Sequence, residues 1–177
     1  MIILITGASH TGKTLLAQRM LETYKYPYLS IDHLKMGLIR SGCTRLTPED
    51  DDELTAYLWP IVREIIKTAV ENRQSLIVEG CYIPFDWRSD FDERYLPDIR
   101  FLCLAMTDAY LDAHFSEIGA HASDIELRQH DATPTLESVR ADHHAYIEGF
   151  RRRHERVVLI DSDFERSMQE ILALPLA

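Results

Sequence analysis

The sequence predicts an α/β fold in which helices cover both faces of a parallel sheet. Short β-prone runs alternate with segments of helical periodicity along the 177 residues, and this order gives parallel strands joined by right-handed crossovers. The β-prone runs are almost continuously apolar, as expected of strands buried on both faces. Most of them end on glycine or acidic residues, and ligands of such sheets bind at the carboxyl ends of the strands.

The first half of the chain contains two of the predicted strands and three helices. A strand over residues 2–5 leads into a helix that includes residues 15–21, and a second strand over 27–31 ends at Asp32, before a short helix over 33–40. A long helix is expected over 51–71, because its apolar residues recur every three to four positions. The acidic run at 49–53 is interpreted as the start of this helix, where acids complement the helix dipole, rather than as a metal site.

The second half continues the alternation. Strands are expected over residues 75–78, 99–105 and 157–160, and helices over 109–127, 136–155 and 164–172. The polar segment 128–134 separates two of these helices and is a candidate lid. The chain shows neither a repeat nor a low-complexity linker, so a single domain over 1–177 is expected, with a lid segment at about 109–140.

A phosphate-binding motif lies between the first strand and the first helix. The segment matches G-x-x-x-x-G-K-[ST] at every position, in the strand–loop–helix context that the motif requires. Its residues are Gly7, Ala8, Ser9, His10, Thr11, Gly12, Lys13 and Thr14. The backbone N–H groups of such a loop surround phosphates at the positive end of the helix. We expect Lys13 to contact the β and γ phosphates and the Thr14 hydroxyl to bind Mg²⁺, which implies a nucleoside triphosphate with magnesium.

Composition and charge argue against several classes of protein. The formal net charge is -10, whereas binding to nucleic acid rests on a basic surface. The sequence has neither a stretch of membrane-spanning length nor an export signal, so we expect a cytoplasmic protein without a nucleic-acid or membrane partner. The three cysteines are too scattered for a disulfide framework or a zinc site. The histidines lack a third ligand at metal spacing and are expected in the core or at the surface.

With these residues in place, the chain resembles the P-loop small-molecule kinases of the nucleoside monophosphate kinase type. This group includes adenylate, shikimate and gluconate kinases, chloramphenicol phosphotransferase and the zeta toxins. The resemblance spans nearly the whole chain; it rests mainly on the loop, and also on Asp32, the Glu79-Gly80 pair and an arginine-bearing lid. It implies a five-stranded sheet in the order 2-3-1-4-5 and ATP as the phosphoryl donor.

The same resemblance implies roles for residues outside the loop. An aspartate at the end of the second strand orients or deprotonates the acceptor hydroxyl in such kinases, and Asp32 is similar to it, although it can also cap the following helix. Glu79 is similar to the acid that holds magnesium through water, beside Thr14. Arg128 and Arg140 are similar to lid arginines that stabilise charge during transfer, and solvated surface arginines are the alternative.

The acceptor side departs from the family pattern. Nucleoside monophosphate kinases carry an arginine shortly after the third strand, and this chain has none between Glu79 and Phe85. Beside Asp32 and Glu79, three cations could compensate as substrate-binding residues: Lys35, Arg40 and Arg88. Tyr82 and Trp87 would offer flat apolar walls for a ring in the acceptor, or they could equally anchor the core.

We therefore expect ATP-dependent phosphoryl transfer to a hydroxyl or phosphate of a small metabolite, carried out by a monomer or a homodimer. One alternative is a toxin-like kinase that acts on an activated sugar, and another is a regulatory P-loop protein that binds nucleotide without catalysis. A GTP-dependent switch is less favoured, because the chain has neither Asn-Lys-x-Asp nor Asp-x-x-Gly after the third strand. The sequence does not define the acceptor.

Overall fold

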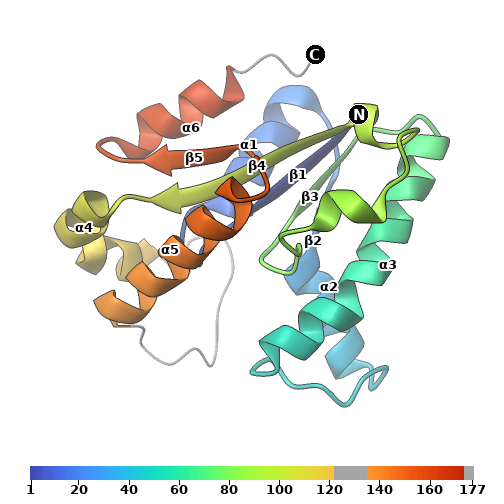
Figure 1. Ribbon diagram of the computed structural model, residues 1–177, viewed down its shortest axis with the longest axis horizontal. Helices are drawn as coiled ribbons and strands as arrows, with labels where there is room; N and C mark the ends of the chain where they lie inside the picture. The colour runs from blue at the N-terminus through green and yellow to red at the C-terminus, as the bar shows by residue number, and fades with distance from the viewer. Residues whose placement is uncertain (122–134, 174–177) are drawn as a thin grey trace.

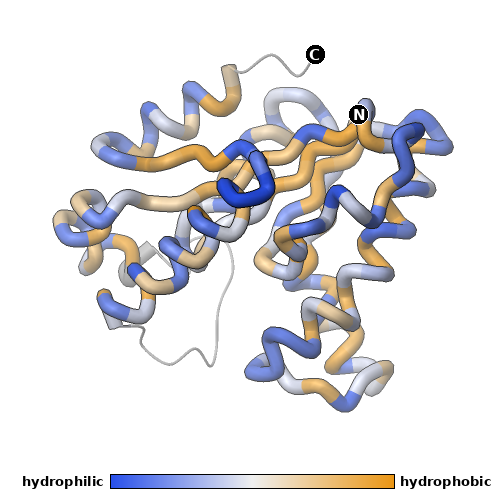
Figure 2. The backbone as a smooth tube through the Cα atoms, viewed as in Figure 1, coloured by the Kyte–Doolittle hydropathy of each residue, from blue (hydrophilic) through white to orange (hydrophobic). Residues whose placement is uncertain are grey.

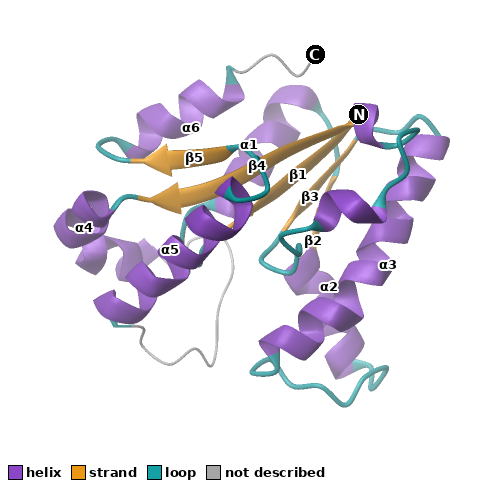
Figure 3. Cartoon of the chain, in the orientation of Figure 1, coloured by secondary structure: helices purple, strands orange, loops and turns teal. Residues whose placement is uncertain are grey.

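The computed structural model describes residues 1–121 and 135–173, and it confirms the predicted α/β architecture (Figures 1 and 3). Within these residues five strands form one sheet in the order β2-β3-β1-β4-β5. All neighbouring strands are parallel, so their carboxyl ends meet at one edge of the sheet. The strands are β1 (Ile2–Gly7), β2 (Tyr28–Ser30), β3 (Leu76–Glu79), β4 (Ile99–Met106) and β5 (Val157–Ile160).

The centre of the sheet is the most apolar part of the molecule. Every residue of β1 is buried, and the strand lies between β3 and β4 in the sheet. Figure 2 shows these central strands as a continuous hydrophobic band inside more polar helices and loops. A strand covered on both faces gains most from aliphatic side chains at every position, which is why the run Ile2–Ile5 is uninterrupted.

Helices cover the two faces of the sheet and create two core clusters. On one face α1 (Lys13–Tyr24), α4 (Asp108–His121) and α6 (Phe164–Leu172) pack against β1 and β4. On the other face lie α3 (Asp51–Glu71) and the segment after β3, which contains the short 3-10 helices η1 (Trp87–Asp90) and η2 (Leu96–Asp98). The helix α5 (Leu136–Arg151) contributes Val139 to the first cluster and Phe150 to the second; it crosses in front of the sheet in Figure 1, with α1 behind.

Element boundaries differ from the sequence prediction at two functionally relevant places. The helix α2 (Ile31–Arg40) begins directly after β2, so Asp32 lies in the first helical turn and not at the end of a strand. The helix predicted over 136–155 ends at Arg151, and the chain turns there before it enters β5. The lid expected at about 109–140 includes α4 and the start of α5, and its residues 122–134 lie outside the described part of the chain.

The described helices include none that is long and apolar enough to span a bilayer. The longest of them, α3, matches its predicted bounds of 51–71 and contains Pro60. Its first turn carries Asp51, Asp52 and Glu53, as expected of acids that complement the positive end of a helix.

Candidate active site

The phosphate-binding motif forms the turn between the carboxyl end of β1 and the first residue of α1. A Cβ atom at Gly7 would lie 2.1 Å from the carbonyl oxygen of Leu104 in the neighbouring strand β4, so the backbones approach too closely there for any side chain. Gly12, directly before α1, has a φ of 80°, which glycine adopts without steric cost. The two glycines of the motif therefore meet backbone requirements that place the loop at the start of α1.

The side chains of the loop are engaged with the loop itself. The Lys13 ammonium donates a hydrogen bond of 2.7 Å to the carbonyl oxygen of Ala8, and the Thr11 hydroxyl donates to the same oxygen at 2.9 Å. Both side chains belong to buried residues, and Lys13 is only 5% exposed. An ammonium group held this deep needs an electronegative partner, and the Ala8 carbonyl supplies one. A phosphate in the loop would offer Lys13 a stronger, charged partner.

Glu79 and Thr14 come together beside the loop. Glu79 is the last residue of β3 and pairs with Ile5 of β1, so the sheet register brings its carboxylate to the base of α1. The Thr14 hydroxyl is 3.4 Å from Glu79 Oε2, and Glu79 is only 1% exposed. Hydroxyl and carboxylate oxygens are the donors that Mg²⁺ accepts, with water and phosphate oxygens completing its shell. The pair therefore fits a magnesium ion bound together with a nucleotide.

No group of three His, Cys, Asp or Glu side chains suited to hold a metal by themselves occurs among residues 1–121 and 135–173. A site made only of protein ligands would require such a group. A kinase-type magnesium needs fewer protein ligands, because substrate phosphates supply the others.

Asp32 lies in a hydrogen-bonded chain of four side chains from three different segments. Lys35, one turn further along α2, is 2.8 Å from Asp32 Oδ1, and its ammonium donates to the Tyr82 hydroxyl at 2.8 Å. The Tyr82 hydroxyl in turn donates to Asp51 Oδ1 at 3.1 Å, at the start of α3. Ser30 of β2 pairs with Glu79 of β3, so Asp32 enters α2 at the same edge of the sheet as the loop.

Electrostatics fixes the charge states of Lys35 and Tyr82. Burial opposes the ammonium form of Lys35, but the attraction of Asp32 and the hydrogen bonds to Asp32 and Tyr82 outweigh it and raise the pKa of Lys35. Burial also raises the pKa of Tyr82, which stays a neutral phenol that donates to Asp51. Lys35 is therefore a permanent cation whose charge is directed at Asp32.

Asp32 is suited to contact an acceptor, but it does not cap α2, because Ser30 is the N-cap residue and Asp32 lies inside the first turn. In the first turn of α2 its carboxylate is stabilised by the helix dipole, and the Lys35 ammonium holds it in one orientation. The side chain is a quarter exposed, at 25%, so a small molecule can still reach it.

Three other predicted acceptor-side residues lie apart from this group. Arg88 forms a two-pronged ion pair with Glu155, at 2.7 and 2.9 Å. Trp87 is 0% exposed and stacks on Phe101 with ring centroids 5.3 Å apart, so this structure places it in the core. Arg40 is exposed in the last turn of α2, about 12 Å along the helix from Asp32. Roles for these three in acceptor binding stay predictions, and the structure does not bring them to Asp32.

The two lid arginines cannot both be placed. Arg128 lies outside the described residues. Arg140, on α5, pairs with Asp112 and, at 3.4 Å, with Asp108, and both acids belong to α4. In this structure Arg140 contacts α4 and not the loop, and its assignment as a nucleotide ligand stays a prediction.

A residue that the sequence analysis did not single out contacts the loop directly. Asp142 Oδ2, on α5, accepts a hydrogen bond of 2.8 Å from the backbone N–H of Ser9. Its neighbour His143 is fully buried, and its Nδ1 accepts from the backbone N–H of Met106 at the end of β4, at 2.8 Å. Burial lowers the pKa of His143 to about 4. No spacing or periodicity in the sequence links Ser9 to a position 133 residues further along.

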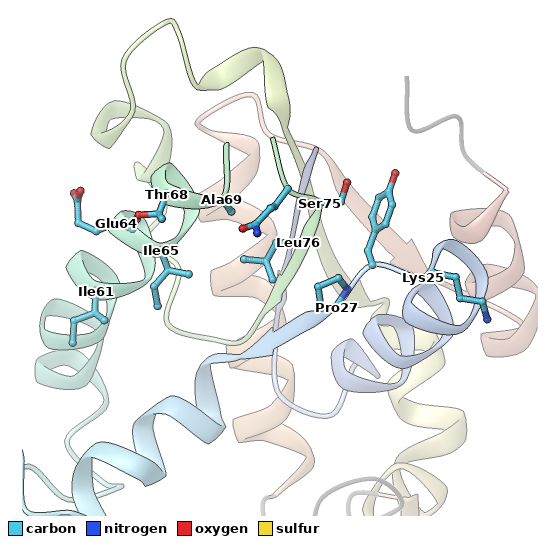
Figure 4. A pocket seen from close by; sticks show the side chains of 11 residues that line it. Lys25, Pro27, Ile61, Glu64, Ile65, Thr68, Ala69, Ser75 and Leu76 are labelled. Carbon is cyan, nitrogen blue, oxygen red and sulfur yellow. The ribbon is translucent and has the colours of Figure 1, made fainter. Parts of the chain in front are cut away.

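A hollow lies at the opposite edge of the sheet, where β2 and β3 begin (Figure 4). It has a volume of about 820 Å³, and residues before β2, on α3 and before β3 line it, among them Pro27, Ile65 and Ser75. Ligands of parallel α/β sheets bind at the carboxyl ends of the strands. The hollow is therefore separate from the loop, Glu79 and Asp32, which all lie at that other edge.

Solved kinase structures share this fold over almost the whole chain. A gluconokinase from Sinorhizobium meliloti 1021 is 17% identical, with a TM-score of 0.54, over 97% of this chain and 89% of the other. A sugar kinase from Janibacter sp. HTCC2649 is 17% identical, with a TM-score of 0.58, over 97% of this chain and 91% of the other. Shikimate kinase from Aquifex aeolicus vf5 is 13% identical, with a TM-score of 0.56, over 97% of this chain and 94% of the other.

No protein-family model and no curated protein sequence matches the chain. At identities of 13% to 17% these structural neighbours define the fold and not the substrate. The sheet order, the loop between β1 and α1 and the named neighbours agree with one another. The chain has the fold of the P-loop kinases related to the nucleoside monophosphate kinases.

Proposed function

We propose that this protein is an ATP-dependent kinase that transfers the terminal phosphoryl group of ATP to a hydroxyl group of a small metabolite. One observation carries the proposal: the phosphate loop, the Thr14–Glu79 pair and the Asp32–Lys35 pair lie at the same carboxyl edge of the sheet. These groups correspond to the three needs of the reaction, which are a phosphate cradle, a magnesium site and a group that handles the acceptor.

The donor side would act through positioning and charge. The loop N–H groups and Lys13 would hold the phosphates, and Lys13 would exchange the Ala8 carbonyl for a charged phosphate oxygen. Thr14 and Glu79 would hold magnesium, which neutralises charge on the β and γ phosphates. In transfer the acceptor oxygen bonds to the γ phosphorus while the bond from that phosphorus to the ADP oxygen breaks.

On the acceptor side, Asp32 would take the proton that the hydroxyl loses or would orient that hydroxyl for attack. Lys35 would hold the Asp32 carboxylate in place through the 2.8 Å ion pair. The Lys35 and Arg88 cations are each already paired with a carboxylate, which makes each a weaker partner for an acceptor phosphate than an unpaired cation would be. A hydroxyl acceptor is therefore favoured over a phosphate acceptor. The neighbours named as gluconokinase, sugar kinase and shikimate kinase support a hydroxylated metabolite.

The direct test is a screen for ADP release with ATP, magnesium and panels of sugars, sugar acids, nucleosides and hydroxylated antibiotics. Once an acceptor is found, Lys13→Ala and Asp32→Asn are each expected to lose at least about a hundredfold in kcat/KM, because one removes a charged phosphate contact and the other the acceptor base. The matched control is Asp98→Asn, which neutralises an exposed acid at the opposite edge of the sheet. Near-normal turnover of Asp32→Asn would contradict the role of Asp32 in handling the acceptor. Tight ATP binding by Lys13→Ala would contradict the role of the loop in binding the nucleotide.

A further inference from the structure

We propose that the acceptor of this kinase is a polyhydroxylated compound without negative charge, either neutral or cationic as in an amino sugar, and that Asp51 selects it together with Asp32. The inference rests on the proposed kinase function and names the chemical class of its acceptor. It begins from the hydrogen-bonded chain that joins Asp32, Lys35, Tyr82 and Asp51.

The carboxylates of this chain are more open to solvent than its cation. Asp51 is exposed at the start of α3. The Asp32 side chain is 25% exposed, whereas that of Lys35 is 13% exposed. The Lys35 ammonium also lies over the Tyr82 ring, 4.9 Å from its centroid. A molecule that arrives from solvent therefore meets the two carboxylates before it meets the cation between them.

The single cation of the chain does not balance both carboxylates. Lys35 is 2.8 Å from Asp32 Oδ1. The Asp51 carboxylate instead accepts from the Tyr82 phenol at 3.1 Å, and burial raises the pKa of that phenol, which stays neutral. Two carboxylates and one ammonium leave one net negative charge at neutral pH.

The surrounding segment has the same sign. Residues 32–53 form α2, the connection to α3 and the first turn of α3, and they include six acidic and three basic residues. One of these cations, Lys35, is paired with Asp32. Arg40 lies about 12 Å along α2 from Asp32, and Arg45 is exposed in the connection. A carboxylate or phosphate on an acceptor would approach like charge here, whereas an ammonium group would be attracted.

Hydrogen bonding favours the same class of acceptor. Asp32 and Asp51 each use Oδ1 in the chain of side chains, and a carboxylate has a second oxygen that can also accept. The Lys35 ammonium already donates to Asp32 and to Tyr82. Hydroxyl and ammonium groups supply donors to such carboxylates, whereas an ionised carboxylate or phosphate offers only acceptors. The group therefore matches a molecule rich in hydrogen-bond donors.

The test uses three probes with the same six-carbon polyol chain that differ only at the first carbon. They are glucamine, which is a cation, sorbitol, which is neutral, and gluconate, which is an anion. ADP release with ATP and magnesium at pH 7 gives kcat/KM for each. We expect the order glucamine, sorbitol, gluconate, with at least about a tenfold difference between the first and the last. The difference should shrink at high salt, which screens charge.

The variant that tests the selecting residue is Asp51→Asn. Asparagine keeps an oxygen that accepts from the Tyr82 hydroxyl and removes only the charge. We expect this variant to lower the ratio of kcat/KM for glucamine to that for gluconate about tenfold. The matched control is Asp52→Asn, which removes the same charge from the next, exposed position of the same helical turn. Because adjacent residues on a helix point in different directions, the control should change the ratio less than twofold.

The outcomes separate this inference from the proposed function. Gluconate used as well as glucamine, an anion as the best acceptor of the broader panel, or a ratio that Asp51→Asn leaves unchanged would overturn the inference and leave the kinase function standing. A neutral or cationic compound as the best acceptor would support it. If neither the three probes nor the panel raised ADP release above the rate without acceptor, the proposed function would fall together with the inference.

Discussion

Acidification should unfold the protein partly through one buried imidazole, that of His143. Its pKa is lowered from 6.5 to about 4, first because burial disfavours the imidazolium, and the charges of Lys13 and His10 act in the same direction. The hydrogen bond from the Met106 N–H to Nδ1 also requires that this nitrogen carry no proton. The folded protein therefore holds His143 neutral.

The sign of the effect follows from the two pKa values. Between pH 6.5 and 4 the unfolded chain binds more protons at this histidine than the folded chain does. The stability contributed by neutral His143 is therefore present above pH 6.5 and is lost as the pH falls toward 4. At 1.36 kcal/mol per pKa unit, the loss between pH 7 and pH 5 is about 2 kcal/mol.

The assay is urea unfolding of wild type and His143→Gln at pH 7, 6 and 5, because glutamine can still accept from the Met106 N–H and does not titrate. Other groups titrate in both proteins, so their contributions cancel in the difference between the two unfolding free energies. That difference should shrink by about 2 kcal/mol from pH 7 to pH 5. His33→Gln, at an exposed position, is the control and should follow wild type. A difference between wild type and His143→Gln that stays constant with pH would refute the assignment of a buried neutral imidazole.

Three further predictions concern the positioning of Asp32, the packing of α5 and the place of Trp87 in the core. Lys35→Met should lower kcat at least about tenfold with ATP affinity unchanged, because Asp32 loses its partner at 2.8 Å; an unchanged kcat would contradict this. Gly149→Ala should lower the free energy of unfolding measured in urea, since its Cβ would lie 2.4 Å from Phe85. In a Phe85→Ala background the same substitution should raise this free energy by about 1 kcal/mol, and an effect of the same sign in both backgrounds would be inconsistent with a clash. Trp87→Ala should lower the free energy of unfolding by about 3–5 kcal/mol and leave the KM for the acceptor unchanged. A raised KM would indicate that Trp87 does line the acceptor site.

The elements that could be predicted from the sequence are those whose signals are local. The uninterrupted apolar run of β1 and the amphipathic repeat of α3 depend only on neighbouring residues, and α3 has the bounds that its pattern predicted. The boundary between β2 and α2 was placed less well, because Ile31 continues a β-prone run and yet opens the helix. A single residue there moves Asp32 from a strand end into a helical turn.

The residues of the candidate site divide in the same way, into those with a local signal in the sequence and those without one. The loop from Gly7 to Thr14 was predicted by its motif, since the backbone requires a glycine at both positions: Gly7 has no room for a side chain, and Gly12 has a positive φ. The pairing of Lys35 with Asp32 spans one turn of helix and could have been anticipated from that spacing. Contacts of Tyr82 with Asp51, and of Ser9 with Asp142, join segments far apart in the chain and left no pattern in it.

The sequence by itself determined the phosphate loop, the alternation of strands and helices and the candidate acids Asp32 and Glu79, because a motif and a periodicity are properties of adjacent residues. Only the tertiary structure decided which partner each charged or aromatic side chain meets. It placed Trp87 in the core, turned Arg140 toward α4 and brought the Asp142 carboxylate to the Ser9 N–H. Such choices depend on how α5 and the segment after β3 pack on the sheet, and side-chain charge or ring type alone does not fix them.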